Sequence, residues 1–146
     1  MAGTKQKDLG IALLRIMVGV VFLAHGSQKL FVMGVGNVGG FLAQIGVPAA
    51  PVMGVVLTLT EFLGGLALVL GLFTRWAALL LAFAMLVAVS AVHLQNGFFL
   101  PRGFEYALTL LVANVGLALT GAGAYALDNV LFKGRASAPE LRRNAA

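Results

Sequence analysis

Residues 9–31 read LGIALLRIMVGVVFLAHGSQKLF, an apolar run in which Arg15, His25 and Lys29 are the ionisable residues. A helix needs about 20 residues, at about 1.5 Å each, to cross about 30 Å of hydrocarbon, and this run meets that length. It lacks the alternation of polar and apolar positions that marks a barrel strand. Lysines precede the run, as in a secretory signal, but Arg15 interrupts it and no clear cleavage site follows. We therefore predict a retained transmembrane helix.

Three further apolar runs, at about residues 49–73, 76–94 and 104–123, also have spanning length. The whole chain of 146 residues is 60% hydrophobic and only 10% charged, whereas soluble domains are about 25% charged. A soluble globule of this size needs more polar residues to cover its surface. The composition therefore excludes a soluble enzyme, a disordered chain and a nucleic-acid-binding protein. We predict an all-α fold in which residues 1–132 form a four-span antiparallel transmembrane helical bundle.

The segment between the first two runs, residues 32–48, is rich in glycine and carries a helical pattern. Its apolar residues recur at positions i, i+3, i+4 and i+7, which lie on one face of a helix. These residues are Val38, Phe41, Leu42 and Ile45. The pattern predicts a short interfacial helix on the outer membrane surface. A glycine-rich loop packed over the bundle explains the composition equally well, and the sequence leaves both interpretations open.

Positive charges are distributed unequally between the two ends of the predicted spans. One side would hold Lys5, Lys7, Arg75, Lys133, Arg135, Arg142 and Arg143, and Arg15 would lie nearer to that side. The other side would hold Lys29 and Arg102. Because cytoplasmic loops carry the excess of Lys and Arg, we predict a multi-pass protein of the plasma (inner) membrane with both termini cytoplasmic. The same placement explains the net charge of +5 without nucleic acid as a partner. Residues 133–146 would be a basic, disordered cytoplasmic tail.

Ionisable side chains inside the spans are the candidates for function, because each costs about 3 kcal/mol at mid-depth. At about 100° per residue, Arg15, His25 and Lys29 share one face of the first helix. Glu61 lies near the middle of the second run, where we expect Arg15 or His25 to be its partner. Together with residues near the outer edge, these side chains are predicted to line a polar pocket that opens to the outer side. The predicted lining residues are Arg15, His25, Lys29, Glu61, His93, Arg102 and Glu105.

Such a pocket could hold a small polar or anionic ligand, or the head group of a quinone that exchanges protons with His or Glu. The alternative is structural: Lys29, Arg102 and Glu105 could be interface anchors, and Glu61 could belong to a buried ion pair. Haem is disfavoured because the chain has only two histidines, at different depths. A metal site is not expected, since three or four good ligands are not evident. The absence of cysteine excludes thiol catalysis and disulfides within the chain.

Two other polar residues are given structural roles. Asn114 follows Glu105 by nine residues, which places it on the opposite face of the fourth helix. We expect it to form a hydrogen bond between helices. Asp128 precedes a short apolar turn that ends at Phe132, and we expect it to cap that turn.

Short motifs follow one another in a definite order along the chain. They are Leu14-Arg15, residues 22–30 (FLAHGSQKL), 46–48 (GVP), 61–65 (EFLGG), 71–75 (GLFTR), His93 with Asn96-Gly97, Glu105-Tyr106, and 123–128 (GAYALD). Each is weak alone, but their order and spacing over almost the whole chain resemble the DoxX family of membrane proteins. The resemblance implies a four-helix inner-membrane protein. It marks as family-pattern positions Arg15, His25, Lys29, Glu61, Arg75, His93 and Glu105.

The resemblance also implies a link to redox chemistry, because the family is named for a subunit of a thiosulfate:quinone oxidoreductase. Its members are linked to membrane oxidoreductase complexes, oxidative stress and quinone detoxification. We therefore expect the small subunit or partner of a quinone-linked oxidoreductase or oxidative-stress system, embedded in the lipid bilayer as a homo-oligomer or beside a redox enzyme. A small-solute or proton-coupled carrier is an alternative, as is a membrane scaffold that docks soluble redox enzymes. The sequence leaves open whether the protein is itself an enzyme and which cofactor it uses.

Overall fold

The computed structural model describes residues 2–132, and every regular element in that range is a helix. The elements are α1 (Ala2–Ser27), η1 (Gln28–Met33), α2 (Val35–Gln44), α3 (Ala50–Leu70), α4 (Thr74–Val87), η2 (Ala88–His93), η3 (Leu94–Asn96), α5 (Glu105–Thr120) and α6 (Leu127–Phe132). The elements η1 and η2 are π-helical continuations of α1 and α4. The all-α prediction is confirmed. The predicted tail, residues 133–146, lies outside the described residues.

Three helical segments are long and apolar enough to cross a membrane: Gly3–Met33, Ala50–Leu70 and Thr74–Asn96. The fourth apolar helix, α5, has 16 residues, fewer than the roughly 20 that a span uses. Large apolar side chains on the outer faces are more than half exposed, among them Met17 on α1 and Val112 on α5. Such faces suit contact with lipid rather than water. The chain is thus a membrane protein with three or four helices of spanning character.

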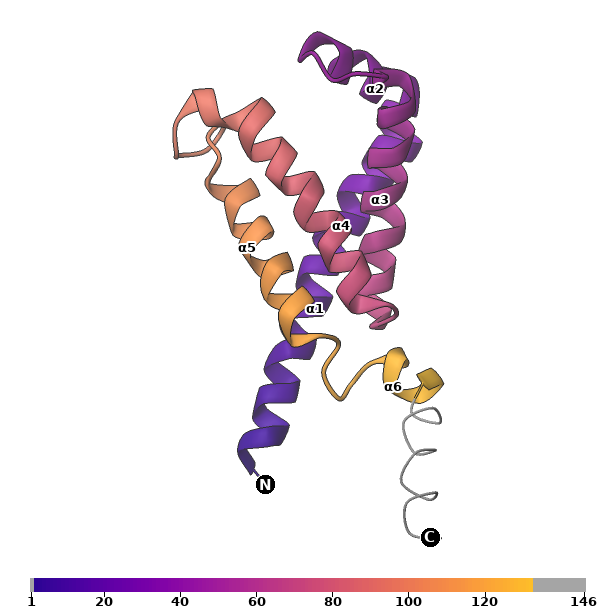
Figure 1. Cartoon of the computed structure of the whole chain (residues 1–146), viewed down its shortest axis with the longest axis vertical. Helices are drawn as coiled ribbons and strands as arrows, with labels where there is room; N and C mark the ends of the chain where they lie inside the picture. Colours follow the sequence, from indigo (N-terminus) through magenta and orange to yellow (C-terminus); the bar gives the residue numbers. More distant parts are fainter. Residues whose placement is uncertain (1, 133–146) are drawn as a thin grey trace, which may run out of the picture.

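Two helix pairs make up the body of the molecule. The first is α1 packed along α3, and the second is the hairpin of α4 and α5, which leans across the first pair (Figure 1). The core lies where the four helices meet and includes Phe22, Leu68, Leu81 and Leu117. In Figure 1, α2 and the connection between η3 and α5 lie at one end, whereas the start of α1 and α6 lie at the opposite end. The two ends of the molecule are therefore built from different segments.

Glycines bring the backbones of α1 and α3 into contact. A Cβ atom added at Gly65 of α3 would lie 2.8 Å from the carbonyl oxygen of Gly19 on α1. One added at Gly26 of α1 would lie 2.6 Å from the Cα atom of Phe62 on α3. Both distances are too short for a side chain, so only glycine permits this approach. The contact fixes the height of every α1 residue relative to α3.

The segment after the first span forms α2, which packs on the start of α3. A Cβ atom added at Gly54 of α3 would lie 2.8 Å from the Cα atom of Gly39 on α2. Val38 and Leu42 of the predicted apolar face are buried, whereas Phe41 is 45% exposed. The segment is therefore helical, as one interpretation predicted, and packed over the other helices, as the second predicted.

Two polar residues have contacts that differ from those predicted. The carboxylate of Asp128 accepts hydrogen bonds from the N–H groups of Phe73 at 2.7 Å and Thr74 at 3.2 Å. Asp128 therefore caps the start of α4 rather than α6, the helix in which it lies, because α6 lies next to the start of α4. The side-chain amide of Asn114 donates to the carbonyl oxygen of Leu110 on its own helix, at 2.8 Å. The prediction of a bond between helices was wrong for Asn114, because the carbonyl one turn earlier is the nearest acceptor.

The glycine contact predicts that Gly65→Ala destabilises the protein. The added methyl group must push α1 away from α3, and overpacking of this kind costs about 1–3 kcal/mol. We expect a melting temperature several degrees lower in detergent, measured by the fluorescence of the single tryptophan, Trp76.

Gly116→Ala is the matched control, because a Cβ atom at Gly116 of α5 meets nothing within 4 Å. Alanine there should leave the melting temperature unchanged or raise it slightly, since alanine favours helix over glycine by about 0.5–1 kcal/mol. Equal losses for the two variants would contradict the proposed packing.

Candidate functional site

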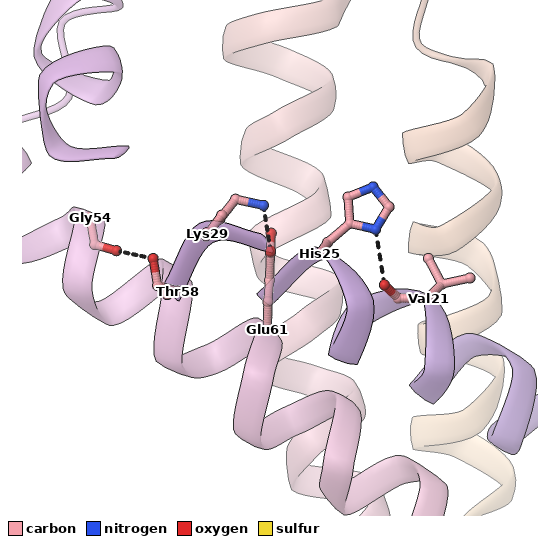
Figure 2. A network of polar contacts seen from close by, with 6 residues as sticks. All are labelled: Val21, His25, Lys29, Gly54, Thr58 and Glu61. Atoms are coloured by element: carbon pink, nitrogen blue, oxygen red, sulfur yellow. Dashed lines mark hydrogen bonds and ion pairs between the residues drawn. The ribbon is translucent and has the colours of Figure 1, made fainter. Parts of the chain in front are cut away.

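A partly buried ion pair joins η1, the π-helical continuation of α1, to α3. The Lys29 Nζ atom lies 2.5 Å from Glu61 Oε2, and the side chains are 19% and 5% exposed (Figure 2). Glu61 was expected to pair with Arg15 or His25, and that expectation was wrong. The reason is the glycine contact: Gly26 places the α1 backbone on Glu61 and Phe62, so the side chain of Lys29, three residues later, reaches back over Glu61.

Each of the two histidines is oriented by a backbone carbonyl group. His25 Nδ1 lies 2.9 Å from the carbonyl oxygen of Val21, one turn earlier on α1 (Figure 2). His93, the last residue of η2, places Nδ1 2.9 Å from the carbonyl oxygen of Arg102 in the connection to α5. The His25 ring also lies 6.4 Å from the ring of Tyr106 on α5, measured between centroids. Each imidazole is thus oriented by a hydrogen bond at its own Nδ1 atom.

The ion pair and both histidines border a single cavity of about 860 Å³. Helices α1, α2, α3, α4 and α5 and both π-helical segments contribute to its wall. Its polar lining residues are His25, Lys29, Thr60, Glu61, His93 and Tyr106. The rest of the wall is mainly aliphatic and aromatic and includes Phe22, Phe41, Leu42, Phe83 and Leu110. The cavity therefore combines a large apolar surface with a few charged and hydrogen-bonding groups, as ligand sites commonly do.

Arg15 lies outside this cavity and has a different set of contacts. Its guanidinium is buried and donates from Nη1 to the carbonyl oxygen of Leu68 at 2.9 Å and from Nη2 to that of Tyr125 at 2.6 Å. Leu68 is in the last turn of α3, and its carbonyl oxygen also accepts a hydrogen bond from the N–H group of Gly71 at 3.2 Å. Arg15 therefore ties α1 to the end of α3 and to the segment before α6. About ten residues, or roughly 15 Å of helix, separate it from His25.

Arg102 and Glu105 also lie outside the cavity. Arg102 is exposed and reaches the site only through its backbone carbonyl oxygen, which holds His93. Glu105 begins α5, and its Oε1 atom accepts a hydrogen bond from the N–H group of Leu100 at 2.8 Å. This hydrogen bond joins the first residue of α5 to the segment that connects η3 with α5. Of the residues predicted to converge, the structure brings together His25, Lys29, Glu61 and His93.

Sequence reasoning missed some residues that the structure adds to the site. Thr60 is adjacent to Glu61, and Tyr106 is adjacent to Glu105, so both were near predicted positions without being chosen. Hydropathy gives no signal for a single hydroxyl in an apolar run. The π-helical segments were missed too, although Lys29 lies within one and His93 ends the other. Such segments are frequent at functional sites.

The residues described here offer no metal centre, because no cluster of three or more His, Asp or Glu side chains occurs among them. The charged groups at the cavity form one neutral pair, Lys29 with Glu61. The arrangement therefore suits hydrogen bonding and proton exchange with an organic ligand.

Comparison with known proteins places this site in a family. A family model described as DoxX matches residues 10–94. The chain belongs to the DoxX family. The matched region of this DoxX protein contains both residues of the ion pair and both histidines.

Relatives of this DoxX protein cover nearly its whole length. It is 34% identical over 131 residues to a Bacillus subtilis protein named "Putative oxidoreductase CatD", a match that covers 90% of this chain and 93% of the relative. It is 37% identical over 133 residues to an uncharacterized Haemophilus influenzae protein, covering 88% and 96%. It is 31% identical over 134 residues to the Escherichia coli inner membrane protein YqjF, covering 88% and 97%. No solved structure matches the chain.

The ion pair predicts strong coupling between Lys29 and Glu61. Lys29→Met leaves the Glu61 carboxylate buried without its cation, which costs about 3 kcal/mol or more when one partner of a buried pair is removed. We expect Lys29→Met to lower the melting temperature in detergent markedly. The double variant Lys29→Met/Glu61→Gln should recover at least half of that loss, because no charge then remains unpaired.

Glu105→Gln serves as the control, since an amide oxygen can still accept the hydrogen bond from Leu100. This variant should change the melting temperature little. Additive losses in the double variant would show that Lys29 and Glu61 do not stabilise each other.

Proposed function

We propose that this DoxX protein binds a quinone, or a molecule with a similar small polar or anionic head, and acts as the small subunit or partner of a quinone-linked redox system. One observation carries the proposal: a buried ion pair and two oriented histidines form the polar part of an otherwise apolar cavity. A quinone has the matching form, with a small oxygen-bearing ring and an apolar tail.

The buried ion pair supports a functional site over a purely structural one. Removing two charges from water commonly costs more than their attraction returns, so an apolar pair would often be at least as stable. Ionisable residues within membrane spans are rare and commonly mark ligand or proton pathways. Lys29 and Glu61 stand at a cavity wall rather than in closed packing. The pair is therefore placed where a ligand can use it.

The cavity has the size and chemistry for such a ligand. Its volume of about 860 Å³ lies within the range of roughly 300–1,000 Å³ that is usual for small-molecule sites. Side chains such as Phe41 and Phe83 can contact an apolar ring or tail. Lys29 can donate to an oxygen of the head, and His25 and His93 can accept from its hydroxyl groups in the reduced form. The printed name of the Bacillus subtilis relative, "Putative oxidoreductase CatD", agrees with redox chemistry nearby.

We also propose four antiparallel spans with both termini cytoplasmic. α5 would be the fourth span, shorter than the others and extended at its start by the apolar residues Phe98, Phe99 and Phe104. Lys5 and Lys7 lie in the first two turns of α1 and Arg75 lies in the first turn of α4. The starts of both helices are at the end of the molecule that holds α6 (Figure 1). An excess of Lys and Arg marks the cytoplasmic side.

This topology predicts opposite labelling of cysteines introduced at the two ends. The chain has no cysteine, so Thr4→Cys and Gln95→Cys each create a single thiol. In right-side-out membrane vesicles, a membrane-impermeant maleimide should label Gln95→Cys directly and Thr4→Cys only after permeabilisation. Labelling of Thr4→Cys in intact vesicles would exclude cytoplasmic termini.

The proposed ligand predicts saturable binding to the purified protein. In detergent, decyl-substituted benzoquinone or its hydroquinone should shift the melting temperature upward with increasing concentration, because a ligand of the folded state stabilises it. Glu61→Gln should weaken binding about tenfold by breaking the ion pair that orders the head-group end.

The control is again Glu105→Gln, which changes a carboxylate outside the cavity and should leave the binding curve unchanged. If neither redox form binds, or if Glu61→Gln binds as well as the unaltered protein, this cavity is not a quinone site.

A further inference from the structure

Both histidines that line the cavity use the same nitrogen, Nδ1, to meet a backbone carbonyl group. A carbonyl oxygen can only accept a hydrogen bond, so the nitrogen that faces it must carry the proton. Nδ1 faces a carbonyl oxygen at 2.9 Å in His25 and again at 2.9 Å in His93. In the neutral imidazole, Nε2 is then the unprotonated nitrogen and an acceptor. No hydrogen bond within residues 2–132 involves Nε2 of either ring.

The remaining polar groups of the cavity add to this excess of acceptors. Glu61 uses Oε2 to hold Lys29, and within the described residues its Oε1 atom has no hydrogen-bond partner. The Nδ1–H groups of both histidines are already used by backbone carbonyl oxygens. Among the other described lining side chains only Lys29 must donate, because the hydroxyl groups of Thr60 and Tyr106 can either donate or accept. The cavity thus offers His25 Nε2, His93 Nε2 and Glu61 Oε1 as acceptors against one ammonium group.

From this imbalance we infer that the cavity selects an aromatic ligand with two hydroxyl groups over the corresponding dione. This inference rests on the proposed function and names the redox form that the site prefers. Each hydroxyl of a dihydroxy-aromatic ring can donate to a bare imidazole nitrogen or to the carboxylate. The carbonyl oxygens of a quinone can only accept, and they find Lys29 alone as an obligatory donor.

The same acceptors give the site a means of taking up the ligand's protons. A hydroxyl hydrogen-bonded to an imidazole nitrogen is already aligned for proton transfer to it. Electrons would have to leave to a separate acceptor, and the inference here concerns only recognition of the reduced, hydroxyl-bearing form. The site would therefore hold a hydroquinone product more tightly than the quinone from which it came.

A set of three probes with one ring and one tail tests the ligand side. They are decyl-substituted 1,4-benzohydroquinone, the benzoquinone, and the 1,4-dimethyl ether, which keeps the ring oxygens but cannot donate. We expect the hydroquinone to bind at least about tenfold more tightly than either other probe, since it alone can donate one or two hydrogen bonds to the acceptors of the cavity. Binding is measured anaerobically by titration of the purified, full-length protein.

Histidine variants test the protein side. His25→Asn and His93→Asn each retain an amide N–H near the position of Nδ1 but remove Nε2. The preference for hydroquinone over the other two probes should fall several-fold in each variant, while the affinity for the benzoquinone changes little. Phe83→Leu is the matched control: it alters an apolar wall residue and should weaken all three probes by a similar factor.

The outcomes separate this inference from the proposed function. If all three probes bind with equal affinity, or the benzoquinone binds most tightly, the site does bind quinones but the selectivity is wrong. A preference for hydroquinone that survives both histidine variants would also overturn the role given to Nε2. If none of the probes binds, the proposed function itself fails, and the selectivity fails with it.

Discussion

Gly19, Gly26 and Gly65 remove the side chains that would otherwise separate α1 from α3, and the two backbones meet. In a lipid environment helices gain little from the hydrophobic effect on associating, so close packing and hydrogen bonds must hold them together. This contact brings the α1 backbone onto Glu61, within reach of Lys29. The ion pair, and with it the polar part of the cavity, depends on that approach.

Two basic residues of the first helical segment, Gly3–Met33, serve different purposes. Near the middle of α1, Arg15 gives its hydrogen bonds to backbone carbonyl groups of Leu68 and Tyr125, and it joins segments that are distant in the chain. In η1, Lys29 meets a carboxylate at the wall of a cavity. A planar guanidinium with several donors suits the satisfaction of helix-end carbonyls, whereas a compact ammonium suits a single anionic partner. Burial of a positive charge is therefore structural in one case and compatible with ligand binding in the other.

Residues from five α-helices and two π-helical segments, rather than from one sequence motif, line the cavity. α2 covers it through Phe41 and Leu42, α4 contributes Phe83, and α5 contributes Tyr106. Two π-helical segments supply Lys29 and His93. A π-helical turn holds more residues than an α-helical one and so rotates the side chains that follow it. Both residues line the cavity from these segments.

Much of the architecture followed from the sequence alone. A chain that is 60% hydrophobic and 10% charged cannot cover itself in water, and only helices satisfy their own backbone hydrogen bonds in lipid when the pattern is not that of a barrel. The apolar runs predicted the helical positions. Of the five residues predicted to share one level, His25, Lys29 and His93 line one cavity, and Arg102 and Glu105 do not. Only the tertiary structure decided that Glu61 pairs with Lys29 and that Arg15 binds carbonyl groups instead. Depth along one helix does not specify the register or rotation of its neighbour, and here both are set by backbone contact at glycine. The acceptors of Arg15 include Tyr125, 110 residues away, and hydropathy carries no information about so distant a contact.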